Sequence, residues 1–251
     1  MNYVYLVFTA LIGLVLGSFL SVIVFRPDGK GVLFGRSECR KCLTRLKWYD
    51  LFPIFSFLML KGRCRYCGHK ISFLYLIIEL VTLSTFVPYC WLNGPCLGIE
   101  NIYWLGIIFI LLALSFFDYL YYILPDRIIG IGFLVAILRG LSPGSGGFSE
   151  GILTGLALAG FFCIIFIVSQ GKWMGFGDVK LAGFIGFVLG FPLAVWSILV
   201  AIWIGAFWGI GLLVAKKANL KTPLPFGTFM SVTAILLIIF KKYVEYFSPI
   251  F

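Results

Sequence analysis

Two pairs of cysteines offer the clearest chemistry in the sequence. Cys39 and Cys42 form one C-x-x-C pair, Cys64 and Cys67 form a second, and twenty-one residues separate the pairs. Four thiolates in this arrangement satisfy the tetrahedral coordination of Zn²⁺, and Gly68 suits the tight turn that follows a metal-binding pair. The spacing predicts a structural zinc site, because four cysteine ligands leave no open position for catalysis. Paired disulfides and free thiols are the alternatives.

Other nucleophiles are sparse. The only histidine, His69, lies two residues after the second cysteine pair, and the chain has no H-E-x-x-H motif and no phosphate-binding loop. A Ser-His or Cys-His nucleophile, a zinc-dependent peptidase and a nucleotide-driven machine are therefore unsupported. Cys90 and Cys96 could form a disulfide or remain partly buried thiols, and Cys163 is expected to be a packing residue. Hydrolytic chemistry is left to the carboxylates.

Four of the ten acidic residues lie in or beside apolar segments, where an ionisable group is costly and is by default a functional candidate. They are Glu79, Asp118, Asp126 and Asp178. Asp118 stands at the end of a strongly apolar stretch, and Asp178 follows a glycine-bearing turn that lets backbone or substrate approach closely. A helix N-cap is the alternative role for Asp178 and the favoured role for Asp126, while Glu79 could equally be a satisfied packing acid.

The elements that must position these residues are membrane-spanning helices. Hydrophobic residues make up 61% of the 251 residues and charged residues only 12%, which is typical of membrane proteins. A helix needs about 20 residues to cross the bilayer, so the sequence predicts an all-α polytopic fold with about eight spans and a cytoplasmic four-cysteine insert after the first helix. The apolar runs are residues 3–25, 71–92, 102–124, 127–141, 150–169, 179–193, 194–215 and 225–247. The predicted domains are the first helix at 1–25, the insert at 26–70, a second helix with an outer loop at 71–101, and a membrane core at 102–251 that carries Asp118 and Asp178.

The Lys and Arg residues predict the orientation. If the N-terminus lies outside, cytoplasmic segments hold seventeen of the twenty Lys and Arg residues, as the positive-inside rule requires. Asp118 and Asp178, sixty residues apart, then both map to cytoplasmic ends of spans and can meet at one depth. Two close carboxylates do not both ionise readily, so one would hold a proton while the other acts as a base on water, as in aspartic proteases.

The net charge of +10 also predicts affinity for anionic lipid headgroups. Nucleic-acid binding is the poorer interpretation, because the basic residues flank membrane spans and fit no nucleic-acid-binding motif.

Motifs along most of the chain resemble those of the prepilin peptidase family of GxGD-type membrane aspartyl proteases. The matching residues are Gly17-Ser18-Phe19-Leu20 through Arg26-Pro27, the cysteine pairs flanking Trp48-Tyr49-Asp50 and Pro53, Asp118 through Pro125-Asp126, and Gly175-Phe176-Gly177-Asp178-Val179-Lys180-Leu181. The resemblance implies that Asp118 and Asp178 are the catalytic pair. It also implies cleavage after the glycine that ends a short basic leader on prepilins or type II secretion pseudopilins, at the cytoplasmic face of the bacterial inner membrane.

Family members with the cysteine domain are commonly bifunctional. The resemblance therefore also implies methylation of the new N-terminus with S-adenosylmethionine as methyl donor, although the sequence assigns no residues to its binding. Ser21 replaces the family's usual asparagine, and Leu124 conservatively replaces its usual isoleucine. Ser21 would bear on methyl transfer if that position contacts cofactor or substrate, whereas the pattern Gly13-x-x-x-Gly17 on the same helix favours close helix packing.

Three alternatives remain at this point. The chain could be a peptidase without methyltransferase activity, a proton- or ion-coupled transporter, or a zinc-dependent membrane scaffold without catalysis. Transporter acids usually lie near the membrane midplane, whereas Asp118 and Asp178 map to its inner edge.

Overall fold

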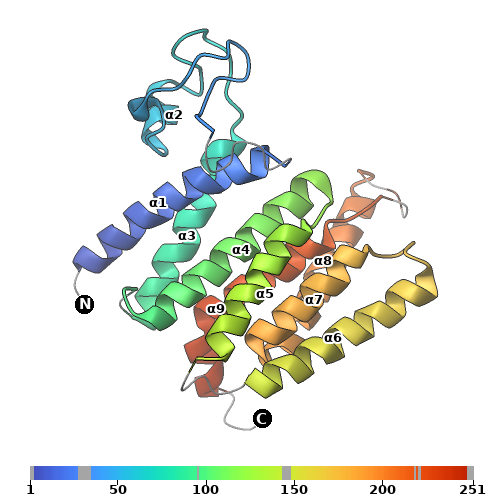
Figure 1. Ribbon diagram of the computed structural model, residues 1–251. Coiled ribbons are helices and arrows are strands. Elements are labelled where there is room, and N and C mark those ends of the chain that lie inside the picture. The colour runs from blue at the N-terminus through green and yellow to red at the C-terminus, as the bar shows by residue number, and fades with distance from the viewer. Residues whose placement is uncertain are drawn as a thin grey trace. The chain divides into compact units, whose positions relative to one another are not determined.

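The computed structural model describes residues 3–27, 35–94, 96–142, 148–217, 219 and 222–247. Helices dominate these ranges, in which the β-structure is limited to two isolated bridges, Glu38 with Arg45 and Arg63 with Lys70. Figure 1 shows the helices in chain order from blue to red. The chain divides into two compact units, Met1–Asn101 and Ile102–Phe251.

Two long helices pack against each other in the first unit. α1 covers Tyr3–Phe25 and α3 covers Leu74–Asn93. Their close approach depends on Gly17, because a Cβ added there would lie 2.9 Å from the Cα of Glu79. The close packing predicted from the small-residue pattern is therefore present. In the sequence, the insert connects these two helices, and it contains the short helices η1 (Trp48–Asp50) and α2 (Phe55–Met59).

The second unit is a bundle organised around α7. Its helices are α4 (Ile99–Tyr121, which begins at the end of the first unit), α5 (Asp126–Gly140), α6 (Phe148–Ser169), α7 (Phe176–Leu189), α8 (Leu193–Val214) and α9 (Phe226–Phe247). α7 contacts α5, α6, α8 and α9, and its residues Leu181, Ala182 and Phe184 are fully buried. The helix that begins beside Asp178 is thus the one most enclosed by its neighbours.

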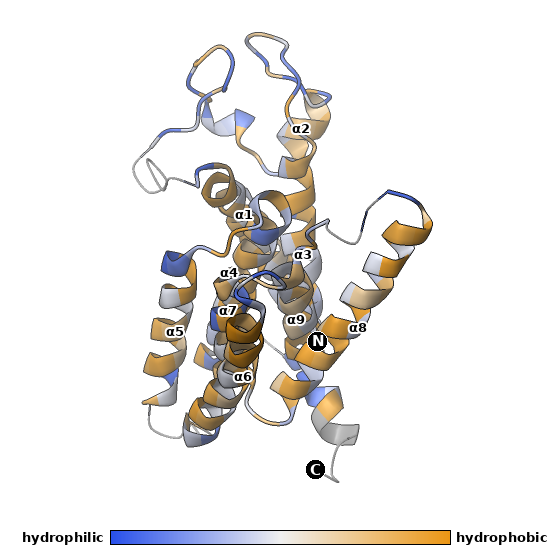
Figure 2. Cartoon of the chain, turned by 90° about the vertical axis from the view of Figure 1, so that its right-hand side faces the viewer, coloured by the Kyte–Doolittle hydropathy of each residue, from blue (hydrophilic) through white to orange (hydrophobic). Residues whose placement is uncertain are grey.

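All eight segments predicted as spans are helical. Among the described residues, α1, α3, α4, α6, α8 and α9 are long and apolar enough to cross a membrane by length and composition. Figure 2 shows apolar colouring along the helices and more polar colouring in the insert. α5 and α7, with 15 and 14 residues, extend only about 21–23 Å at roughly 1.5 Å per residue. The protein is therefore a multi-pass membrane protein in which two of the predicted spans are short.

Two helices end earlier than the apolar runs suggested. α4 ends at Tyr121 because Pro125 disfavours helical backbone before it and Tyr122 turns the chain with a φ of 54°. α7 ends at Leu189 because Gly190, with a φ of 66°, terminates it. The first of these turns follows shortly after Asp118, whereas the second lies at the end of α7 opposite to Asp178.

Candidate metal centre and active site

The two cysteine pairs form matching turns. The Cys39 carbonyl accepts the Leu43 N–H at 2.8 Å, and the Cys64 carbonyl accepts the Gly68 N–H at 2.9 Å. Leu43 and Gly68 both have positive φ angles, of 55° and 66°. The turn predicted at Gly68 is present, and the first pair forms the same turn with a leucine, which is a less favourable residue there.

The four cysteine side chains converge on one point. The Sγ atoms of Cys39, Cys42, Cys64 and Cys67 all lie within 4.8 Å of one another, and those of Cys39 and Cys67 are 3.8 Å apart. Tetrahedral zinc with Zn–S bonds of about 2.3 Å would place its sulfurs about 3.8 Å apart. The number, type and spacing of these ligands therefore fit Zn²⁺, which would complete its coordination without an open position.

Asp50, which lies between the two cysteine pairs in the sequence, connects parts of the insert through hydrogen bonds. Its carboxylate accepts hydrogen bonds from the Arg65 guanidinium at 2.7 Å, the Tyr66 hydroxyl at 2.9 Å and the Lys47 N–H at 3.1 Å. Burial raises the pKa of Asp50, but the hydrogen bonds from Tyr66, Lys47 and Arg65 together outweigh it and lower the pKa overall. The hydrogen bond to Asp50 raises the pKa of Tyr66 to about 12, so this hydroxyl stays a donor at neutral pH.

Asp118 lies near the end of α4 and is only 6% exposed. Its Oδ2 accepts the backbone N–H of Thr228 at 2.7 Å and the Thr228 hydroxyl at 3.0 Å. That hydroxyl also lies 3.1 Å from the Ser115 carbonyl. Thr228 belongs to the first turn of α9, so the start of one helix fixes the acid at the end of another.

Asp178 lies in the first turn of α7 and is 9% exposed. Its Oδ2 accepts the N–H of Gly175, the residue that caps the helix, at 3.2 Å. Asp178 therefore contributes to capping from the third helical position, rather than as the N-cap itself. The Asp118 and Asp178 carboxylates are close enough to interact electrostatically.

Leu124 fills the space beside both acids. A Cβ added at Gly177 would lie 3.1 Å from the Leu124 Cβ, and one added at Gly227 would lie 3.1 Å from the Leu124 Cδ1 and 3.2 Å from the Asp118 Cγ. A larger side chain at either glycine would displace Leu124 or Asp118. The glycine of the G-x-G-D motif thus provides room for close packing at this site.

Asp126 has a different role from the one predicted. It is the first residue of α5, whose N-cap is Pro125, and its Oδ1 accepts a hydrogen bond from the Lys180 ammonium at 2.6 Å. The N-cap prediction for Asp126 is therefore wrong, because the proline before it takes the capping position. The ion pair joins the start of α5 to α7, two residues after Asp178.

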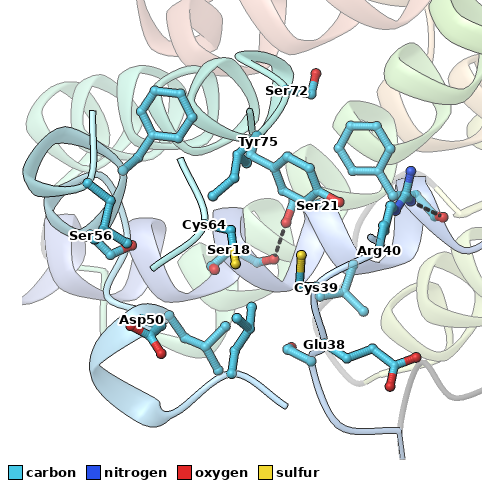
Figure 3. Close-up of a pocket in the computed structure, with 18 of the residues that line it drawn as sticks. Ser18, Ser21, Glu38, Cys39, Arg40, Asp50, Ser56, Cys64, Ser72 and Tyr75 are labelled. Carbon is cyan, nitrogen blue, oxygen red and sulfur yellow. Dashed lines mark hydrogen bonds between the residues drawn. The ribbon is translucent and has the colours of Figure 1, made fainter. Parts of the chain in front are cut away.

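A cavity of about 900 Å³ lies within the first unit (Figure 3). Its walls come from α1, the insert and the start of α3, and include Ser21, Cys39, Cys64 and Glu79. Ser21 is 3% exposed and donates a hydrogen bond to the Ser18 carbonyl at 2.7 Å. Glu79 is 7% exposed and accepts the Ile54 N–H at 2.8 Å. Both residues therefore lie at a cavity as well as in helix packing.

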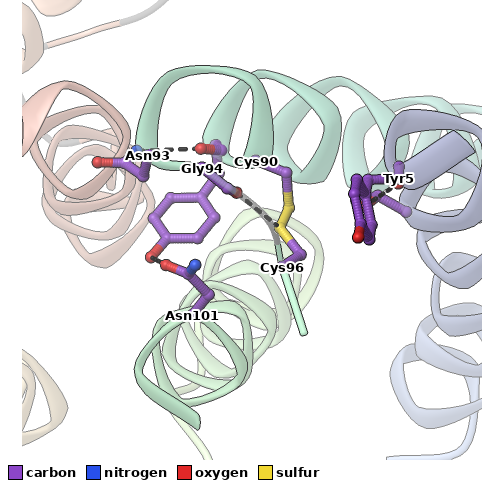
Figure 4. Close-up of a disulfide and its surroundings, with 8 residues drawn as sticks. Tyr5, Cys90, Asn93, Gly94, Cys96 and Asn101 are labelled. Atoms are coloured by element: carbon purple, nitrogen blue, oxygen red, sulfur yellow. Dashed lines mark hydrogen bonds between the residues drawn. A yellow bond between two sulfur atoms is a disulfide. The ribbon is translucent and has the colours of Figure 1, made fainter. Parts of the chain in front are cut away.

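Cys90, in the last turn of α3, forms a disulfide with Cys96, in the loop that follows (Figure 4). Beside it the Tyr89 hydroxyl donates to Asn101 at 2.9 Å, and the Asn93 side chain donates to the Tyr89 carbonyl at 3.0 Å. The four insert cysteines form no disulfide, and neither does the partly buried Cys163 on α6. The disulfide lies at the C-terminal end of α3, whereas the four-cysteine cluster comes before its N-terminal end in the chain.

Apolar spans, an enclosed pair of acids and a four-cysteine insert define a multi-pass membrane protein of the peptidase class. The chain belongs to the type IV leader peptidase family. Residues 11–93 match the model of the Bacterial Peptidase A24 N-terminal domain, and residues 105–210 match that of the Type IV leader peptidase family. The family predicted from the motifs is thereby confirmed, together with peptidase activity.

Similar proteins from other bacteria match this chain over most of its length. A prepilin leader peptidase/N-methyltransferase of Bacillus subtilis is 34% identical over 229 residues, covering 89% of this chain and 90% of the relative. One of Vibrio cholerae is 33% identical over 207 residues, covering 76% and 79%, and one of Myxococcus xanthus is 32% identical over 216 residues, covering 83% and 63%. No solved structure matches the chain.

Thr228 and Lys180 were not singled out by the sequence as partners of the acids. Thr228 is 110 residues from Asp118, and Lys180 is 54 residues from Asp126. The segment Pro225-Phe226-Gly227 at the start of α9 carried a weak signal, because a Phe-Gly pair at the start of a helix also precedes Asp178.

Proposed function

We propose that this protein cleaves the short basic leader of prepilins or type II secretion pseudopilins after the glycine that ends it, with Asp118 and Asp178 as the catalytic pair. The observation that carries the proposal is the way these acids are held. Each is buried, each is anchored through Oδ2, and within the described residues Oδ1 of each accepts no hydrogen bond. One oxygen of each carboxylate is therefore left for water or substrate.

The chemistry follows from two carboxylates that interact. Because two neighbouring negative charges repel in a buried site, one acid holds a proton while the other remains a base. The base takes a proton from water, whose oxygen attacks the carbonyl carbon of the scissile peptide bond. The acid donates its proton to the carbonyl oxygen. As the carbon–nitrogen bond breaks, the proton that the base took from water passes to the leaving amine, and a hydroxyl of the intermediate returns its proton to the other carboxylate. Thr228 and Gly175 keep both carboxylates oriented throughout.

The proposed location is the bacterial inner membrane, with the acids and the insert on the cytoplasmic side. Most Lys and Arg residues fall in the segments assigned to that side, which the positive-inside rule favours. The disulfide at Cys90 and Cys96 and the absence of disulfides among the insert cysteines support the same orientation, since disulfides form in oxidising compartments. Anionic lipid headgroups would then face the basic insert.

The proposal includes methylation of the new N-terminus and a structural zinc ion. S-adenosylmethionine would supply the methyl group, as the names of the relatives suggest. Zn²⁺ held by Cys39, Cys42, Cys64 and Cys67 would fix the fold of the insert, which is too small to bury a large core of its own.

Cleavage of a purified prepilin by Asp118→Asn, Asp178→Asn and the double variant tests the peptidase assignment. Each single change should lower the rate by about a thousandfold or more, because asparagine cannot take a proton from water, and the losses should not add. Asp126→Asn is the matched control. Asp126 side-chain exposure is 72%, so its loss should change the rate little.

Thermal unfolding in the same detergent checks that the variants fold. Substantial activity in either Asp118→Asn or Asp178→Asn would show that a different group performs the chemistry.

A further inference from the structure

One side of the short helix α2 is apolar and exposed. Phe55, Leu58 and Met59 are each exposed by 59% or more, and their spacing of three and four residues places them on the same side of the helix. The ring of Phe52, which is also exposed, has its centroid 6.1 Å from that of Phe55. We call Phe52, Phe55, Leu58 and Met59 the α2 patch. Apolar side chains gathered on a segment outside the membrane spans mark an interaction surface.

The other side of α2 already has its contacts. Ser56, Phe57 and Leu60 line the cavity of the first unit, and the ring of Phe57 packs edge-on against that of Phe73 with centroids 6.0 Å apart. Figure 2 shows apolar colouring on α2 within an insert that is otherwise more polar. Turning the α2 patch inward would break the cavity wall, so the patch must find its partner outside the insert.

Two hydrogen bonds place α2 beside the first turns of the span α3. The Ile54 N–H, at the start of α2, donates to Glu79 Oε2 at 2.8 Å, and the Ile71 N–H donates to the carbonyl of Gly62, just after α2, at 2.7 Å. Glu79 is the sixth residue of α3, about 8 Å along a helix that rises 1.5 Å per residue. The 20 residues of α3 extend about 30 Å, which is the thickness of the hydrocarbon core. α2 therefore lies at the level where hydrocarbon meets headgroups.

Basic residues flank the α2 patch. Lys47 precedes it, Lys61 and Arg63 follow it, and all three residues are exposed. Asp50 is the only acidic residue between positions 47 and 63, and it is paired with Arg65 at 2.7 Å. Apolar side chains beside Lys and Arg are typical of segments that lie in the interface of an anionic membrane.

We propose that the α2 patch inserts into the headgroup region of an anionic membrane leaflet, with Lys61 and Arg63 beside the lipid phosphates. The depth of α2 favours lipid over a protein partner, because a bilayer surrounds α3 at this level. Since the other side of α2 forms part of the cavity wall, contact with lipid would hold that wall in place. The inference uses the contacts of the first unit alone and does not depend on the proposed peptidase activity.

Fluorescence quenching by spin-labelled lipids tests this contact in the full-length protein. Acridonylalanine, a fluorescent amino acid, is incorporated in place of Met59, and the protein is placed in nanodiscs that contain phosphatidylglycerol. A nitroxide near the headgroup should quench the fluorophore at least about twofold more strongly than a nitroxide at the end of the acyl chain. The reason is that an interfacial helix buries its apolar side only about 5–10 Å into the boundary.

The same fluorophore in place of Lys41 is the control within the insert. Lys41 is an exposed residue between the first two cysteines and lies outside the α2 patch. Its fluorophore should be quenched at least about twofold less than the one at position 59, because an exposed polar turn has no apolar side to insert.

A second pair of variants tests the contribution of charge. Lys61→Gln/Arg63→Gln should lower quenching at position 59 in phosphatidylglycerol nanodiscs to the level found in nanodiscs of phosphatidylcholine alone. Lys216→Gln/Lys217→Gln removes the same number of positive charges from exposed residues just after α8 and should leave the quenching unchanged.

Quenching at position 59 that is absent, or no stronger than at position 41, would overturn the proposal. If a purified prepilin then protected the fluorophore from iodide in solution, the α2 patch would be assigned to the substrate instead. Unfolding temperatures check that the labelled proteins fold. If the protein labelled at Met59 is unstable, the fluorophore at Phe55, another exposed residue of the patch, decides the result.

Discussion

Asp118 and Asp178 are held in the same way, each through a single carboxylate oxygen. Oδ2 of Asp118 accepts two hydrogen bonds from Thr228, and Oδ2 of Asp178 accepts one from the Gly175 N–H. Backbone donors hold a carboxylate without using another ionisable side chain. The remaining oxygen of each acid keeps its capacity to accept a proton. Anchoring and chemistry are therefore divided between the two oxygens of each side chain.

Thr228→Val should lower the cleavage rate by about tenfold, because it removes one charged hydrogen bond to Asp118 but keeps the backbone N–H. Thr228→Ser retains a hydroxyl and should restore most of the rate. The loss should appear in kcat rather than KM if Thr228 positions the acid and does not bind the leader. Steady-state cleavage of a purified prepilin by the two variants measures this. Full activity in Thr228→Val would show that the backbone contact alone is sufficient.

At the scale of elements, apolar runs predicted where helices form, and proline and glycine fixed where they end. The eight predicted segments are helical, but α4 and α7 end early at turns that involve Pro125 and Gly190. Local sequence patterns did not predict which residues from distant segments contact one another. The sequence around Asp126 resembles a helix start, but it does not reveal that Lys180 lies opposite. Thr228 and the cavity at Glu79 likewise depend on how distant segments pack.

The hydrogen bond from Tyr66, in the second cysteine turn, to Asp50, in η1, gives a test that depends on pH. Tyr66→Phe removes a hydrogen bond to Asp50 and should destabilise the insert by about 1 kcal/mol at pH 7, measured as lower protection from hydrogen exchange. The pKa of Asp50 is lowered in the folded insert. Its stabilising contribution is therefore present above its unfolded pKa of about 3.9 and is lost as the pH falls through the lower folded value.

Hydrogen–deuterium exchange of peptides that cover residues 47–67 measures this difference. The unaltered protein and Tyr66→Phe are compared at the same pH, since acid also releases metal from both. The difference should be about fivefold in protection at pH 7 and should be smaller near pH 3, where the pH approaches the lowered folded pKa of Asp50. An equal difference at both values would mean that Asp50 is not the group through which Tyr66 acts.

At the scale of the molecule, the four-cysteine cluster and the pair of acids belong to different units. The N-terminal family model matches residues 11–93, which contain the cysteine cluster and the cavity, and the peptidase model matches residues 105–210, which contain both acids. The structure divides at Asn101, between these two matches. Zinc would therefore stabilise the first unit and would take no part in the hydrolysis carried out by the second.

Metal analysis and chelation test this separation. Purified protein should contain about one zinc per chain, and a Cys39→Ser/Cys64→Ser double variant should lose it, because two thiolates do not complete a tetrahedral site. A chelator should inhibit cleavage only slowly, as the insert loses its fold, and a Zn²⁺-free peptidase should remain active while the insert stays folded. Zinc content, unfolding temperature and cleavage rate are followed in one time course. Rapid inhibition that zinc reverses, with no change in unfolding temperature, would place the metal in the hydrolytic reaction and contradict the assignment to Asp118 and Asp178.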